Sequence, residues 1–391
     1  MFLLLLAVIY LAFISLGLPD SLLGAAWPVM QQHFHVPLPY VGFVTMVISG
    51  NTIISSLLSE RMTHRFGTRA VTVFSVFLTA LALYGFSTVR SFPMLFVWAV
   101  PYGLGAGAID AALNNYVALH YSSRHMSWLH CFWGVGTIIS PYIMSYALTR
   151  ATWEAGYRTV SAIQFGIVAV LLLSLPLWRV NASKSAAVKR EKVLGLRGAF
   201  KIKGVPAVLI GFFAYCAAES TAMIWASSYF VKSRGVAEGT AAAYAALFFI
   251  GITAGRFAAG FAPSSLSDRS RIRIGVAAAL CGAALIALPL SVDTAAIIGF
   301  VVLGLGCAPV YPAIIHATPD HFGAENSQAI IGIQMAAAYT GSTLMPPVFG
   351  AMASVLKMEL LPFYIAGFLC VTVAMMECSY RGVCSKAPAV L

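Results

Sequence analysis

The sequence predicts an all-α membrane protein with about twelve membrane-spanning helices. Of its 391 residues, 60% are hydrophobic and only 9% are charged, whereas an ordinary soluble domain is about a quarter charged. A mean hydropathy of +0.86 over this length indicates that lipid surrounds most of the surface. The two halves of the chain also resemble each other, and a basic stretch separates them. We therefore expect two pseudo-symmetric bundles of six helices each.

Apolar runs long enough to cross a bilayer recur along the whole chain. In the first half they cover 2–31, 39–60, 69–89, 92–121, 125–149 and 155–178. In the second half they cover 205–231, 239–262, 272–291, 294–317, 326–353 and 360–379. The longest polar stretch lies between the halves and is strongly basic. We predict an N-terminal bundle over 1–179, a basic cytoplasmic linker over 180–203 and a C-terminal bundle over 204–391.

The formal net charge of +11 fits a membrane protein whose basic loops face the cytoplasm. If both termini lie inside, most basic residues fall on the cytoplasmic side, and the ones left outside are Arg90, Arg150, Arg158, Lys232, Arg234 and Lys357. This asymmetry predicts an N-in, C-in orientation and argues against nucleic acid as a partner. We expect a monomeric multi-pass protein of a plasma membrane, and of the bacterial inner membrane in particular.

The sequence shows no motif for a metal, a nucleotide or an enzyme reaction. The GLG at 103–105 follows no strand and precedes no Lys-Ser or Lys-Thr pair, so it does not predict a phosphate-binding loop. The cysteines and histidines lack metal-ligand spacing. We predict a protein that is not an enzyme and has no cofactor, apart from an ion that is coupled to transport.

An internal duplication explains several matches at an offset of about 200 residues. The GLG at 103–105 recurs at 304–306. Asp20 followed by Trp27 matches Glu219 followed by Trp225. Transporters are commonly built from such repeats, so the duplication favours a transport function.

Three carboxylates lie well inside predicted spans: Asp20, Asp110 and Glu219. A charge at bilayer depth costs a few kcal/mol or more, and low dielectric disfavours the charged form, so these acids are candidates for proton or cation coupling. Asn114 lies one helical turn after Asp110 and shares its face. His130 is the histidine that lies deepest in a span, and it is either a proton relay or a hydrogen-bond bridge. Glu219 has a second interpretation, in which Ser220 and Thr221 satisfy it structurally.

The sequence places no Lys or Arg near the middle of a span, and the deepest is Arg256, at the cytoplasmic end of the eighth. An anionic substrate needs a fixed cation, so we expect a neutral solute or an organic cation. Sugars are held by amides on their hydroxyls and by aromatic faces. The candidate substrate-binding residues are Asp20, Trp27, Asn51, Asn114, Asn115, Trp133, Trp225, Tyr311, Gln334 and Tyr339.

The chain resembles the major facilitator superfamily in its two sets of six spans and in the segment after the second span. There, Ser59, Glu60, Arg61, Arg65, Phe66, Gly67 and Arg69 resemble the signature G-x-L-a-D-r-x-G-r-k, with Ser56 near the expected glycine and Glu60 near the Asp. The resemblance implies two bundles that rock about a midplane cavity. It also implies a cytoplasmic gate in which charges are paired between helix ends, formed here by Glu60, Arg61, Arg65, Gly67 and Arg69.

Asp20 and the D-A-A-L-N at Asp110–Asn114 further resemble the sugar–cation symporter branch, which includes the fucose–proton symporters. In that branch an Asp in the first helix, and an acid followed four residues later by Asn in the fourth, carry proton coupling and sugar binding. Gln334 lies in the eleventh span, which lines the cavity in the resembled family.

We predict proton-coupled symport of a neutral sugar or sugar-like solute by alternating access. Sodium remains an alternative coupling ion, because a carboxylate with amide and carbonyl oxygens also suits a hard cation. The rival function is a proton-coupled exporter of lipophilic cations or drugs. A sensor or a lipid scramblase is a further alternative, since fold does not fix function.

Overall fold

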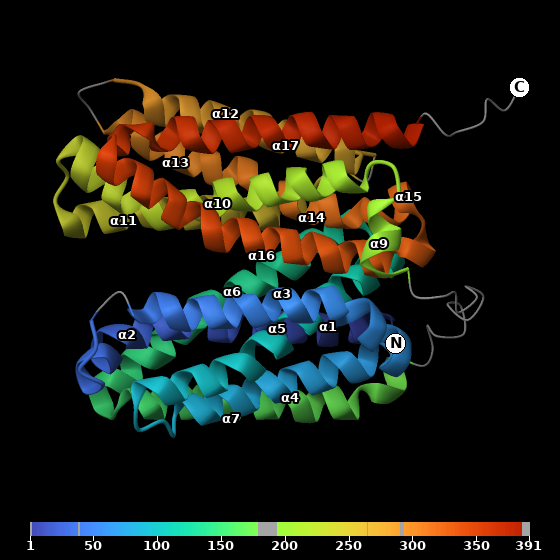
Figure 1. Ribbon diagram of the computed structural model, residues 1–391, viewed down its shortest axis with the longest axis horizontal. Helices are drawn as coiled ribbons and strands as arrows, with labels where there is room; N and C mark the ends of the chain where they lie inside the picture. Colours follow the sequence, from blue (N-terminus) through green and yellow to red (C-terminus); the bar gives the residue numbers. More distant parts are fainter. Residues whose placement is uncertain (1, 38–39, 179–193, 264, 290–292, 385–391) are drawn as a thin grey trace, which may run out of the picture. The chain divides into compact units, whose positions relative to one another are not determined.

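The computed structural model describes residues 2–37, 40–178, 194–263, 265–289 and 293–384, and every regular element within them is helical. They divide into two compact units. The first comprises Met1–Tyr116 and Leu129–Gly195, and the second comprises Val117–Trp128 and Leu196–Leu391. Figure 1 shows both units as helical bundles. Most of the predicted linker, 180–203, lies outside the described residues. The predicted domain boundaries therefore stay predictions.

The first unit is built from seven helices and a short 3-10 turn, and α5 and α6 run into the second unit at their connecting ends. The helices are α1 (Phe2–Asp20), α2 (Leu22–His33), α3 (Val41–Phe66), α4 (Thr68–Phe86), α5 (Phe92–His120), α6 (Ser123–Arg150), α7 (Trp153–Leu173) and η2 (Leu175–Trp178).

The second unit contains the remaining helices, in which α10 packs against α11, α16 and α17. They are α9 (Gly195–Phe200), α10 (Val205–Arg234), α11 (Glu238–Ala259), α12 (Asp268–Ala287), α13 (Thr294–Cys307), α14 (Val310–His316), α15 (Thr318–Phe322), α16 (Ala324–Val355), η3 (Met358–Leu360) and α17 (Leu361–Cys384).

Ten helical stretches of the described chain are long and apolar enough to cross a membrane. Three of them join consecutive elements: Leu3–His33 combines α1 with α2, Thr294–His316 combines α13 with α14, and Met358–Arg381 combines η3 with α17. The long helices α11 and α16 bring the described bundles to the twelve predicted spans. The two interruptions, at Ser21 and at Ala308–Pro309, were not predicted.

The repeated GLG sequences occupy equivalent helix crossings in the two units. A methyl group on Gly103 would lie 2.3 Å from the Ile48 carbonyl oxygen of α3, and one on Gly304 would lie 2.4 Å from the Phe248 carbonyl oxygen of α11. Glycine permits this close approach of backbones, which is how helices associate in lipid. The third residue of each motif contacts the next helix, α4 or α12. The repeat seen in the sequence therefore reflects repeated packing.

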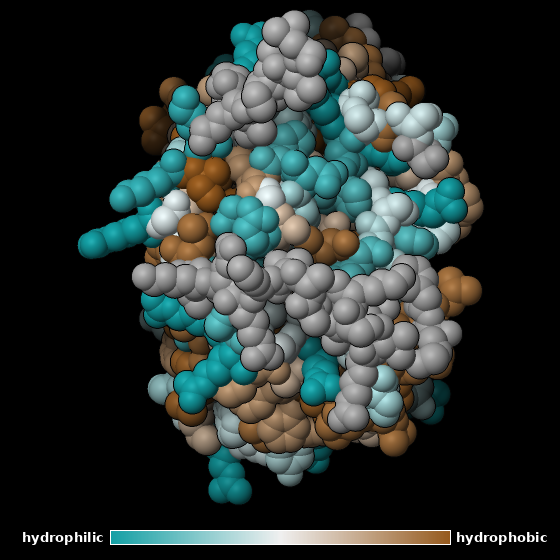
Figure 2. All heavy atoms as spheres, turned by 90° about the vertical axis from the view of Figure 1, so that its right-hand side faces the viewer, coloured by the Kyte–Doolittle hydropathy of each residue, from teal (hydrophilic) through white to brown (hydrophobic). Residues whose placement is uncertain are grey.

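The outer helix faces of the second unit suit lipid, and one end of this unit suits water. Large apolar side chains such as Phe363 (62% exposed) and Ile250 (59%) lie uncovered along the helices. Figure 2 looks onto the end near α9 and α15, where hydrophilic residues gather between apolar flanks in the upper half of the view. This end is the one predicted to be cytoplasmic.

Candidate transport site

Asp20 lies at the point where the first span is interrupted, and its side chain is exposed. The Tyr102 hydroxyl of α5 donates to Oδ1 at 3.0 Å, and the Trp133 Nε1 of α6 donates to Oδ2 at 2.8 Å. Both donors are neutral. An exposed carboxylate in an apolar span that is held by two neutral hydrogen-bond donors is suited to gaining and losing a proton or a cation.

Close packing of α1 against α6 holds Asp20 in this position. A methyl group on Gly17 would lie 2.1 Å from the Trp133 carbonyl oxygen, so α1 touches the α6 backbone one turn before Asp20. Just after Asp20, the Ser21 hydroxyl donates to the Thr137 carbonyl at 2.7 Å. This bond occupies a backbone acceptor of α6 and fixes the interruption between α1 and α2.

Asp110, Asn114 and His130 form a second, buried polar cluster in the same unit. Asp110 is 4% exposed, and its Oδ1 accepts a 2.7 Å hydrogen bond from Asn114 Nδ2, as their one-turn spacing predicts. Asn114 Oδ1 lies 3.2 Å from His130 Nε2. Because Asp110 engages the amide nitrogen, the amide oxygen faces the imidazole, and Nε2 must carry the hydrogen. The carboxylate therefore sets the tautomer of His130 through the amide.

Arg256 lies in the last turn of α11, at the end of the eighth span as predicted, but its side chain reaches further inward than expected. Its guanidinium is buried beside Glu219, with an Arg256 NH2 to Glu219 Oε1 distance of 2.9 Å, and Glu219 lies at the middle of α10. A charged arginine therefore does reach the middle of a span. In the alternative interpretation Ser220 and Thr221 would satisfy Glu219, whereas the structure pairs it with the opposite charge of Arg256. The predicted coupling role of Glu219 stays a prediction.

The other predicted substrate-binding residues of the first unit differ in their burial and in their hydrogen-bond partners. Trp27 is buried, with its ring centroid 6.2 Å from that of Phe92. The Asn51 amide donates to the Val47 carbonyl of its own helix at 2.8 Å. Asn115 is buried at 7% exposure. Trp133 and Asn114 each bond a predicted coupling acid, Asp20 and Asp110 respectively.

In the second unit the predicted ligands are spread over α10, α14 and α16. Trp225 Nε1 donates to the Pro346 carbonyl at 2.8 Å, and the Tyr311 hydroxyl lies 3.3 Å from the Met335 sulfur. Gln334 is fully buried and accepts a 3.0 Å bond from the Thr318 hydroxyl, whereas its Nε2 has no hydrogen-bond partner among the described residues. Tyr339 is half-buried on α16. Their substrate roles stay predictions.

The signature segment differs in form from a loop, because Glu60, Arg61 and Arg65 belong to α3 itself. Gly67 follows with φ 78°, which a glycine adopts without strain. Glu60 accepts the backbone N–H groups of Leu194 (2.6 Å) and Gly195 (3.1 Å), so it caps the start of α9. Arg61, Arg65 and Arg69 are exposed. Their predicted gating role is still to be tested.

Sequence reasoning missed two groups at these sites. Tyr102 directly precedes the GLG motif, and no local signal shows that it bonds Asp20, 82 positions away. The partnership of Arg256 with Glu219 could have been suspected, since a basic residue near a span end has a long side chain that reaches inward.

The profile of the Major Facilitator Superfamily matches residues 9–302. The chain belongs to this superfamily. It is therefore an integral multi-pass membrane protein and a secondary transporter, as the fold and the two repeated bundles indicate. A curated relative, "Bypass of stop codon protein 6" of Saccharomyces cerevisiae, is 22% identical over 388 residues, which cover 90% of this chain and 77% of the relative.

Solved structures of transporters that move different solutes have the same fold as this chain. A proton:xylose symporter matches with a TM-score of 0.79 at 12% identity, covering 97% of this chain and 95% of its own. The Escherichia coli fucose:proton symporter gives 0.75 at 16%, covering 96% and 98%. A human organic anion transporter gives 0.76 at 12%, covering 95% and 98%. These identities show the fold alone, so the sugar–cation symporter branch stays a prediction.

Proposed function

We propose that this transporter moves a neutral sugar or sugar-like solute together with a proton, by symport. The observation that carries the proposal is the exposed Asp20 carboxylate at the interruption between α1 and α2, bonded by Tyr102 and Trp133. It offers a titratable group, a hydroxyl and an indole ring within one small region. Sugars are bound by this combination of polar and aromatic groups.

The proposed coupling follows from the charge on Asp20. Without a proton, the carboxylate is a net negative charge that opposes closure of a loaded, poorly hydrated site. With a proton, the site is neutral and can close around the solute. The buried cluster of Asp110, Asn114 and His130 is a second place where a proton can be held, because it contains a carboxyl group and an imidazole. Sodium in place of the proton is the competing version of this scheme.

The preference for a neutral solute rests on the ion pair between Arg256 and Glu219. Although this guanidinium is buried, its charge is compensated by Glu219 at 2.9 Å. An anionic solute would have to compete with that carboxylate for the guanidinium. A solute without charge avoids this cost.

A second candidate function is export of lipophilic organic cations. The indole of Trp133 and the phenol of Tyr102 beside a carboxylate would also attract an organic cation, through the ring faces and the negative charge. This alternative uses the same residues and predicts a different ligand.

A binding screen on the purified protein separates the two candidates. We expect hexoses or pentoses to raise the melting temperature, since a ligand at a hundred times its Kd stabilises the folded state by about 2.7 kcal/mol. Trp133→Phe, which removes the indole N–H but keeps a ring, should weaken that stabilisation. Stabilisation by cationic dyes and by no hexose or pentose would support the exporter instead.

We further propose that the protein acts as a monomer in a plasma membrane, in particular the bacterial inner membrane, with both termini in the cytoplasm. The distribution of basic residues supports this orientation.

A further inference from the structure

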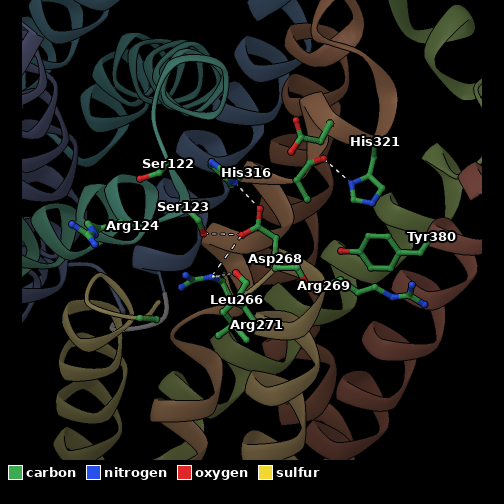
Figure 3. A pocket seen from close by; sticks show the side chains of 14 residues that line it. Ser122, Ser123, Arg124, Leu266, Asp268, Arg269, Arg271, His316, His321 and Tyr380 are labelled. Atoms are coloured by element: carbon green, nitrogen blue, oxygen red, sulfur yellow. Dashed lines mark hydrogen bonds and ion pairs between the residues drawn. The ribbon is translucent and has the colours of Figure 1, made fainter. Parts of the chain in front are cut away.

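Four helix ends of the second unit meet around His316, the last residue of α14 (Figure 3). They are the C-terminus of α5, the N-termini of α6 and α12, and the C-terminus of α14. A cavity of about 500 Å³ opens beside them. Its lining includes Ser123, Arg124, Asp268, Arg271, His321 and Tyr380.

Both ring nitrogens of His316 face oxygen atoms that can only accept a hydrogen bond. Nδ1 lies 2.6 Å from the Asp268 carboxylate oxygen Oδ2, and Nε2 lies 3.0 Å from the Tyr121 carbonyl oxygen. A neutral imidazole has one N–H and can make one of these bonds. Only the imidazolium, with two N–H groups, makes both. The geometry therefore selects the protonated ring.

The two acceptors also attract a positive charge. The Tyr121 carbonyl directly follows α5, where the last carbonyls of a helix lack partners and carry the negative end of its dipole. Asp268 is the first residue of α12 and lies beside Arg271, whose Nε is 4.0 Å from Asp268 Oδ1. An imidazolium between these two acceptors satisfies both.

The other charged and titratable groups near the ring are distributed over the neighbouring helices. Arg271 also donates to three backbone carbonyls, and Arg269 pairs with Glu377 on α17. The remaining groups are Asp320 and His321 on α15, Arg124 and His125 on α6, His120 at the end of α5, and Tyr380 on α17. Asp268 and Tyr121 bond the His316 ring directly, and the Asp320 carboxylate adds an electrostatic attraction for its positive charge.

Asp268 also bonds the other end of the connection between α5 and α6. The Ser123 hydroxyl, at the start of α6, donates to Asp268 Oδ1 at 2.7 Å. One carboxylate and one imidazole thus hold both ends of the connection Tyr121–Ser123. This connection joins α5, which carries Asp110 and Asn114, to α6, which carries His130 and Trp133.

We propose that His316 is a proton-binding site separate from the transport site, and that its proton clamps the α5–α6 connection onto α12 and α14. Loss of this proton breaks one of the two bonds and loosens the connection. The clamp therefore holds at acidic pH and weakens as the pH rises. Through α5 and α6, cytoplasmic pH would act on the ends of the helices that position the candidate transport site.

Hydrogen–deuterium exchange of the full chain in lipid nanodiscs tests the clamp in the segment Val117–Trp128. We expect wild-type amides there to be about tenfold more protected than those of His316→Gln at pH 6. At pH 8.5 the difference should fall to about twofold or less. Comparison of the two proteins at each pH cancels the intrinsic pH dependence of exchange.

His321→Gln is the matched control, since it removes a neighbouring histidine whose Nδ1 bonds the Ala317 carbonyl, and it should behave as wild type. Equal protection of wild type and His316→Gln at pH 6 would overturn the proposal, and so would a difference that does not change with pH. If His316→Gln does not fold, the exchange of the wild-type protein at the two pH values tests the proposal by itself. Its protection, relative to an unstructured peptide of this sequence, must fall from pH 6 to 8.5 in Val117–Trp128 but not in α10.

Discussion

Asp20→Asn is expected to abolish accumulation of the solute while leaving exchange of solute across the membrane intact. Asparagine resembles the protonated side chain in size and lack of charge, and its amide oxygen can still accept a hydrogen bond from Tyr102 or Trp133. It cannot release a proton. The variant should therefore close around the solute and reopen, but without being driven by a proton gradient.

The size of this effect follows from the driving force. One pH unit across the membrane is worth about 1.4 kcal/mol per proton, so wild type should accumulate the solute about tenfold in proteoliposomes, and Asp20→Asn about onefold. Counterflow of labelled solute in the absence of a gradient should be similar in both. Glu359→Gln, which removes an exposed acid at η3, is the control and should accumulate like wild type. Tenfold accumulation by Asp20→Asn would show that another group carries the coupling.

Arg256→Met is expected to destabilise the second unit by about 3–5 kcal/mol, because it leaves the Glu219 carboxylate buried without a compensating charge. In the double variant Glu219→Gln with Arg256→Met, no buried charge remains. Its stability should lie within about 1 kcal/mol of wild type. Unfolding of the three proteins in a denaturing detergent, followed by tryptophan fluorescence, measures this cycle.

The same cycle tests whether the pair is structural or part of coupling. If Arg256→Met is as stable as wild type, Glu219 is not a buried charge that depends on Arg256, and the argument for a neutral solute loses its support. If the double variant is stable and still accumulates solute, Glu219 does not carry the transported proton.

The fold could be predicted from the sequence because lipid imposes a simple rule on it. A backbone in hydrocarbon must satisfy its own hydrogen bonds, so apolar runs of sufficient length become helices. The GLG motifs at Gly103 and Gly304 indicated the duplication, and the structure shows both glycines at equivalent helix crossings. The interruption at Ser21 was not visible in this way, since it depends on a bond to Thr137 in another helix.

The sites were predicted less completely, because residue type and spacing show where a side chain starts and not what it reaches. Asp110 and Asn114 were linked correctly, as their contact is one helical turn. Arg256 was placed by its backbone near a span end, yet its side chain extends to Glu219, 37 positions earlier. His316 ends α14, and its contact with Tyr121 spans 195 positions, so spacing along the chain could not indicate it.

The most direct test of the account is whether solute entry moves protons. Proteoliposomes with no ion gradient, in sodium-free choline buffer, are mixed with the hexose or pentose that stabilises the protein, and the external pH is recorded. We predict that the medium becomes more alkaline as solute and protons enter together, and that Asp20→Asn gives no such change. Solute uptake by wild type without any pH change, or uptake that requires sodium, would contradict proton symport.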